Sequence, residues 1–144
     1  MANEVTVTVA NVRPLRGAII RRAIAGEALA FGDAVYVSSY SGDMPVVSKA
    51  DGSAVDALLV VYGVVVAPQS DSAGATSVAI STACDVVVQG PVTGYSSMTS
   101  GAHIWVSDTV GRLSTVVGTK SCIVGVAETP STVYVRPGMF VAST

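Results

Sequence analysis

The chain has 144 residues, half of them hydrophobic and only 12% charged, and its formal net charge is −2 at neutral pH. This charge argues against a general nucleic-acid binder, which carries a clustered positive field. The longest apolar run, residues 57–68, is shorter than the roughly 20 residues of a membrane-spanning helix. Valine, serine, threonine and glycine dominate, which predicts an all-β protein whose weakly charged surface is partly covered by other subunits.

The N-terminal residues 1–16 predict either a half-exposed strand or an extended arm. Val5, Val7 and Val9 alternate with threonines, as in a strand with one exposed face, until Pro14 interrupts the pattern. Such an arm could add a strand to a neighbouring protein. Half of the eight basic residues lie within ten positions here: Arg13, Arg16, Arg21 and Arg22. They either protect a sheet edge from aggregation or pair with carboxylates of an acidic partner. The residues that begin the chain do not have the pattern of a secretory signal, so we expect synthesis in the cytoplasm without export by the general pathway.

An internal repeat with a constant offset is the most informative pattern. Residues 32–44 align with 101–113, and the matched residues are Gly32, Val35, Tyr36, Val37, Ser38, Gly42 and Met44 with Gly101, Ile104, Trp105, Val106, Ser107, Gly111 and Leu113. Each copy has a glycine, an alternating apolar strand, a polar turn and a returning apolar residue, which predicts a β-hairpin. In the first copy the strands are expected at 34–37 and 44–48, joined by a loop at 38–43.

Further strands are expected at 58–67, 76–81 and 85–89, and Gly63 aligns with Gly125 after a small register change. Pro91, after a glycine, predicts the joint between the copies. The β-domain is therefore expected to span 17–138, with repeat 1 at about 17–89, repeat 2 at about 90–138 and a tail at 139–144. About ten to twelve short strands with glycine-containing turns predict a small barrel or sandwich, either one barrel or two.

The residues that could carry chemistry are few. His103 is the only histidine, which excludes a metal site built on several imidazoles. It aligns with Ala34, so the position accepts an apolar residue, and Asp108 alone is weak support for a catalytic partner. We therefore expect no enzyme activity and no cofactor. Cys84 and Cys122 lack metal-binding spacing and predict small buried side chains, with a disulfide left open. The aspartates in predicted loops are too sparse for calcium and are expected in solvated turns: Asp43, Asp51, Asp56 and Asp71.

Aromatic residues recur at the same strand position of the two copies, Tyr36 and Trp105, with Tyr40 and Tyr95 nearby. Core packing is the default role for such residues. On a surface they would instead be interface anchors or a platform for stacking sugars.

Several segments resemble small virion proteins of tailed phages: residues 25–37, 61–67, 97–107, 111–113 and 123–127. Chiefly they resemble head decoration (cement) proteins, and more distantly β-modules of tail fibres and spikes, over roughly residues 17–138. The resemblance implies a β-barrel or sandwich that trimerises on the capsid exterior and bridges neighbouring major capsid proteins after expansion. The resemblance implies no catalytic residues in this chain. The alternative function is a glycan- or receptor-binding module of a tail fibre or head surface.

Overall fold

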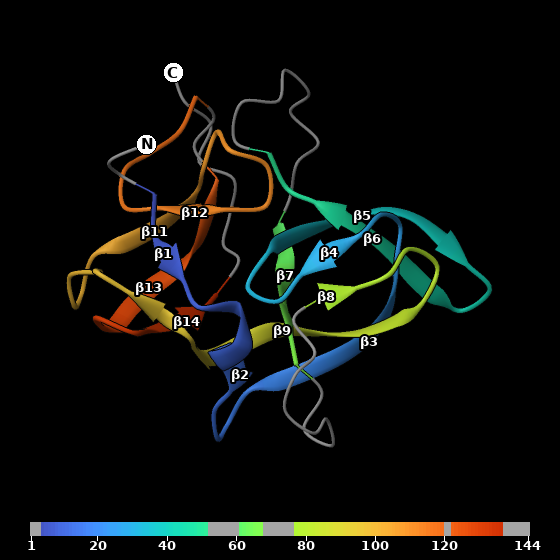
Figure 1. Cartoon of the computed structure of the whole chain (residues 1–144), viewed down its shortest axis with the longest axis horizontal. Helices are drawn as coiled ribbons and strands as arrows, with labels where there is room; N and C mark the ends of the chain where they lie inside the picture. Colours follow the sequence, from blue (N-terminus) through green and yellow to red (C-terminus); the bar gives the residue numbers. More distant parts are fainter. Residues whose placement is uncertain (1–3, 52–60, 68–76, 120–121, 137–144) are drawn as a thin grey trace.

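The computed structural model describes residues 4–51, 61–67, 77–119 and 122–136 and confirms the predicted all-β fold (Figure 1). The described residues form fourteen strands and one short 3₁₀ helix, η1, and none of them forms a helix long and apolar enough to cross a membrane. The elements are β1 Thr6–Val7, η1 Val9–Asn11, β2 Arg13–Pro14, β3 Ile19–Ala25, β4 Leu29–Ala30, β5 Ala34–Ser41, β6 Met44–Lys49, β7 Val61–Val66, β8 Ser77–Val78, β9 Ala83–Thr93, β10 Tyr95–Ser96, β11 His103–Val106, β12 Leu113–Ser114, β13 Ile123–Thr129 and β14 Thr132–Val135.

The first half of the chain forms a closed five-stranded barrel. Its strands follow the order β9–β3–β6–β5–β7, and β7 pairs again with β9. The ring closes because β9 is paired on both edges: Val86 lies opposite Arg21 of β3 and Val65 of β7. Closure removes free edges over the residues that pair around the ring, while the outer parts of β5 and β6 extend beyond it. The valine-rich β7 is buried on both faces, as its continuous apolar sequence predicts.

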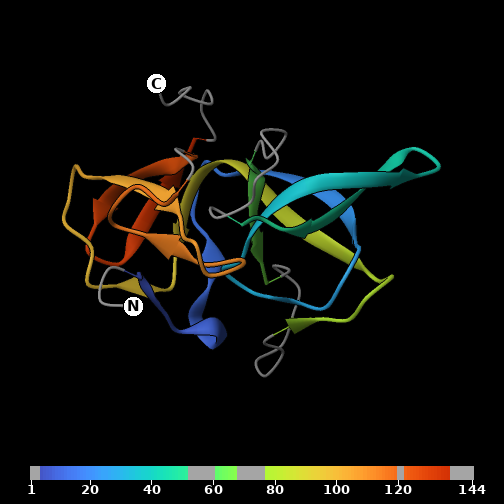
Figure 2. The same ribbon diagram turned by 90° about the horizontal axis from the view of Figure 1, so that it is seen from above.

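The second half of the chain continues from the far end of β9 (Figure 2). Here the order is β9–β14–β13–β11–β12. Residues 83–89 of β9 pair with β3, whereas residues 90–93 pair with β14. The predicted joint between the copies, at Gly90 and Pro91, therefore does not interrupt β9. It is the point at which one continuous strand changes partners from the first half to the second.

Of the two forms predicted for the N-terminal segment, residues 4–14 adopt short strands paired within the chain rather than a free arm. Glu4 forms a β-bridge with Ser114, and the Val5 amide donates to the Leu113 carbonyl at 2.9 Å. β1 then pairs with β10, and β2 pairs with β9. Residues 4–14 thus close the second half, because the edges of β12 and β10 offer unpaired backbone groups and the common hydrophobic core offers burial to Val5 and Val12.

The two halves repeat one strand arrangement. The order β6–β5–β7 in the first matches β12–β11–β13 in the second, with a register irregularity at the same point of both ladders. The matching pairs are Val35↔Gly63 with Ile104↔Gly125, and Tyr36↔Val61 with Trp105↔Ile123. The predicted duplication is confirmed in its strand register. The expected tail at 139–144 lies outside the described residues.

The hairpins of the two copies differ in length. β5 does not end at Val37 but continues to Ser41, so most of the predicted loop 38–43 is strand. Val37 pairs with Val47 across nine intervening residues, whereas Val106 pairs with Leu113 across six. Leu113 therefore corresponds to Val47 rather than to Met44, because three additional residues lengthen the first hairpin.

Candidate functional site

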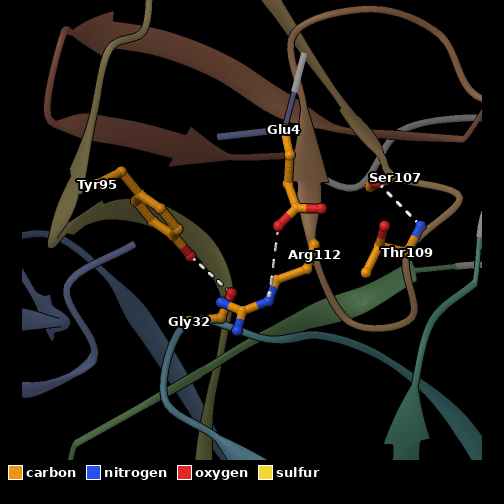
Figure 3. Close-up of polar contacts among 6 residues, drawn as sticks. All are labelled: Glu4, Gly32, Tyr95, Ser107, Thr109 and Arg112. Atoms are coloured by element: carbon orange, nitrogen blue, oxygen red, sulfur yellow. Dashed lines mark hydrogen bonds and ion pairs between the residues drawn. The ribbon is translucent and has the colours of Figure 1, made fainter. Parts of the chain in front are cut away.

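The two halves meet where the second hairpin contacts the first barrel. The Gly111 amide donates to the Ala50 carbonyl at 2.7 Å, and the Ala34 amide donates to the Gly111 carbonyl at 3.0 Å. The loop 107–112 thereby docks beside the start of β5. A second link is the buried Tyr95 hydroxyl, which donates to the Gly32 carbonyl at 2.9 Å (Figure 3). The backbone hydrogen bonds of Gly111 and the side-chain hydrogen bond of Tyr95 together hold the two copies in contact.

Asp33 is a buried carboxyl group at this junction, with only 3% of its surface exposed. Its Oδ2 accepts the Ala30 amide at 2.9 Å. Burial raises the pKa of Asp33, opposed by the Ala30 hydrogen bond and by the charges of Lys49 and Arg112. A Cβ on Gly111 would lie 3.1 Å from the carboxyl group, so the docked loop packs directly on it. Asp33 was not predicted as a site residue, although its alignment with Ala102 of the second copy was a usable signal.

A small hollow lies beside the docked loop. Its volume is about 90 Å³, and its lining residues are Glu4, Ser107, Asp108, Ser114, Val116, Val117 and Gly118. The polar groups there form hydrogen bonds within and between the two loops that flank β12. The Thr119 amide and hydroxyl each donate to Asp108 at 2.8 Å, and the Thr109 amide donates to the Ser107 hydroxyl at 3.0 Å (Figure 3). The hollow is thus a product of loop packing, and Asp108 serves the loop rather than His103.

The rim of the junction carries one long ion pair. Arg112 Nε lies 4.0 Å from Glu4 Oε1, and both side chains are partly exposed (Figure 3). Exposed pairs at this distance contribute little to stability. No three histidine, cysteine, aspartate or glutamate side chains gather as a metal site within the described parts of the chain.

The residues predicted for an N-terminal contact surface are not gathered on one face. Val5 is buried, while Val7 and Val9 are half-buried. Arg21 and Arg22 are adjacent in β3, so their side chains leave opposite faces of the strand. Arg22 Nε lies 3.7 Å from Oδ1 of Asp85, the residue opposite it on β9. Arg13 and Arg16 are exposed around the turn between β2 and β3, close in sequence to the exposed apolar residues Leu15 and Ile19.

The aromatic residues have three different environments. Tyr36 and Trp105 are half-buried at equivalent strand positions, and the exposed His103 ring lies edge-on to Trp105 with centroids 6.0 Å apart. Tyr95 is a core residue, and its burial raises its pKa. Tyr40, by contrast, is 79% exposed.

The two cysteines are buried, as predicted, and no disulfide joins them. Burial raises the pKa of Cys84 to about 11 and also raises that of Cys122, which disfavours the reactive thiolate at neutral pH. Among the loop aspartates, Asp43 is exposed at a turn and Asp51 is half-buried. Asp56 and Asp71 lie outside the described residues.

The most prominent surface feature is a two-stranded ribbon, residues 37–46, at the tip of β5 and β6. It projects from the end of the molecule formed by the first barrel (Figure 2). Val37 is 45% exposed, and a Cβ on Gly42 would have no neighbour within 4 Å. The sequence pattern predicted a loop at 38–43 and did not indicate a ribbon.

Comparisons of the chain with protein-family models, with curated proteins and with solved structures found no match.

Proposed function

We propose that the protein is a structural virion protein, a decoration protein that binds the outer surface of a tailed-phage capsid as a homotrimer. The observation that carries this proposal is the number of large apolar side chains left exposed on a chain with few charges. In the described residues, those 43% to 79% exposed are Leu15, Ile19, Val37, Tyr40, Ile80, Val110, Val116 and Val117. A soluble protein with so much apolar and so little charged surface fits one that functions while covered by partners.

Decoration would act through added contact area. Each bound molecule would bridge neighbouring major capsid proteins, so opening the shell would also require breaking those contacts, and binding would stabilise the assembled state by mass action. Buried apolar surface contributes about 25 cal/mol per Å² before the costs of association. We place the capsid contact at the β2–β3 turn, where Leu15 and Ile19 lie close in sequence to Arg13 and Arg16. Arginine forks there can pair with capsid carboxylates.

The test uses capsids assembled without this protein by the phage that carries its gene. The wild-type chain should bind expanded capsids saturably and raise their melting temperature. Ile19→Glu should weaken binding about tenfold or more, because it places a charge in the contact. Ile80→Glu is the matched control at another exposed isoleucine and should bind normally. Failure of the wild-type chain to bind such capsids would end the proposal.

Deletion of the N-terminal residues is not a suitable test of this contact. Residues 4–14 close the second half of the fold, so a shortened chain would lose binding by losing structure. Point changes on the exposed turn avoid this ambiguity.

A glycan-binding module is the second candidate, favoured by the half-buried Trp105 beside the exposed His103. Such an aromatic pair can stack on a sugar ring. A glycan-array signal abolished by Trp105→Ala, together with no capsid binding, would favour this function over decoration.

A further inference from the structure

The ribbon is weakly supported by the barrel from which it projects. β7 pairs with β5 only as far as Tyr36, and β3 pairs with β6 only at Val46 and Val47, among the residues described. A two-stranded ribbon without a third strand is marginally stable in water. Its apolar residues Val37 and Tyr40 are nevertheless exposed. These features are typical of an element that is completed by a partner.

The two edges of the ribbon are not equivalent. Pro45 lies on the β6 side, where its missing amide donor discourages the addition of another strand. The β5 side, residues 37–41, carries ordinary backbone amides and no proline. A partner is therefore expected along β5, the strand that carries Tyr40.

The second copy shows what such a hairpin can bind. Its loop 107–112 docks at the base of β5, where Ala34 and Ala50 are 0% and 1% exposed. The residue equivalent to Ala34 at the base of β11 is His103, which is exposed. Among the described residues, the hairpin of the first copy thus has an open tip at Gly42, and the base of β11 in the second copy leaves His103 exposed.

We propose that the β5–β6 ribbon of one molecule docks beside His103 at the base of β11 in a second molecule of this chain. The contact repeats between molecules the head-to-tail docking that joins the two copies within one molecule. The ribbon and β11 belong to opposite ends of the fold, so they meet only between molecules (Figure 2). A head-to-tail contact closes into a ring when its rotation permits. The inference rests on the homo-oligomer in the proposed function, but not on capsid binding.

The first test is the molar mass by light scattering coupled to size exclusion. The wild-type chain should form species larger than its 14.5 kDa monomer. The double variant Val37→Ser with Tyr40→Ser should shift toward the monomer. Val110→Ser, whose valine is exposed to the same 45%, is the matched control and should leave the mass unchanged. A monomeric wild-type chain at high concentration, or an unchanged mass of the folded ribbon variant, would overturn the proposal.

The second test locates the contact by cross-linking and does not depend on weakening it. Under mild oxidation, Tyr40→Cys combined with His103→Cys should give a covalent ladder beyond the dimer. Either single variant should stop at the dimer, because one introduced surface cysteine per chain cannot propagate a head-to-tail link, and the native Cys84 and Cys122 are buried. Absence of the ladder would overturn the proposal. Oligomers that persist without this contact would leave the decoration function standing, whereas intact oligomers that do not bind capsids would contradict that function alone.

Discussion

The two copies of the β-unit share their strand register but use their hairpins differently. In the second copy the hairpin is short, and its turn glycine, Gly111, is hydrogen-bonded to the first barrel. In the first copy the hairpin is longer, and the surroundings of Gly42 are open. A shared pattern of glycines and apolar residues therefore fixes pairing within a unit, while three additional residues and the presence of a neighbour decide what the hairpin contacts.

The copies also differ in how they are closed. The first half is closed by β3, a seven-residue strand inside the sheet order. The second half is closed by residues 4–14, which precede the whole repeat in the sequence. The duplicated pattern thus depends on a segment outside it, and this dependence can be tested by substitution.

The largest effect is expected at the glycines that both copies place in the strand after the hairpin. A Cβ on Gly63 would collide with the Val87 carbonyl oxygen, and one on Gly125 with the Tyr134 carbonyl oxygen. Because backbone atoms of a paired strand cannot move aside, we expect alanine at either position to cost about 3 kcal/mol or more of unfolding free energy, measured in urea.

Gly42→Ala is the control for this comparison. Its φ of +59° disfavours alanine, but its Cβ would meet no neighbour within 4 Å, so a cost of only about 1 kcal/mol is expected. Similar costs at Gly42 and Gly125 would show that close strand approach is not the reason for the repeated glycine.

An intermediate effect is expected in the N-terminal segment that closes the second half. Val12 is fully buried, and its side chain would lie 3.3 Å from a Cβ on Gly32. We expect Val12→Ala to lower the unfolding free energy by about 2 kcal/mol, because it removes buried methyl groups. The half-buried Val9 is the matched control, and Val9→Ala should cost about half as much or less. Equal, small effects would contradict a closing role for this segment.

The smallest effect concerns Asp33, whose counterpart in the second copy is Ala102. Because burial raises its pKa in the folded state, the native protein holds this proton more tightly than the unfolded chain. The contribution of Asp33 to the free energy of unfolding is therefore lost as the pH rises from 3.8, the ordinary pKa of the group, through its raised pKa in the folded state. Asp33→Asn keeps an acceptor for the Ala30 amide and should remove that loss, measured as melting temperature against pH.

Asp43→Asn at the exposed turn of the ribbon is the control for Asp33, and its stability profile should follow that of the wild-type chain. If the two variants gave the same profile, the junction would not be the source of the pH dependence.

The candidate surfaces show where inference from the sequence succeeded and where it failed. The repeat, the buried β7 and the buried cysteines were predictable because each is encoded by a local period, an apolar run or a residue type. The arginine patch stays a prediction, but the sequence spacing did not show that adjacent residues of one strand point to opposite faces, which separates Arg21 from Arg22. Val5 was predicted on the apolar side of a strand that pairs with a capsid protein or a neighbouring subunit, whereas the segment pairs within its own chain, because alternation alone does not say where the partner strand lies.

The sequence by itself determined that this protein is all-β and duplicated, because valine-rich alternation and repeated glycines specify strands and turns locally. Only the tertiary structure decided how the strands close. The first described residues complete the second half, one continuous β9 serves both halves, and Asp33 is buried between them. These outcomes depend on which unpaired edges and apolar surfaces lie within reach of one another. Which edges and surfaces meet depends on strands that lie far apart in the chain, so no local sequence pattern specifies it.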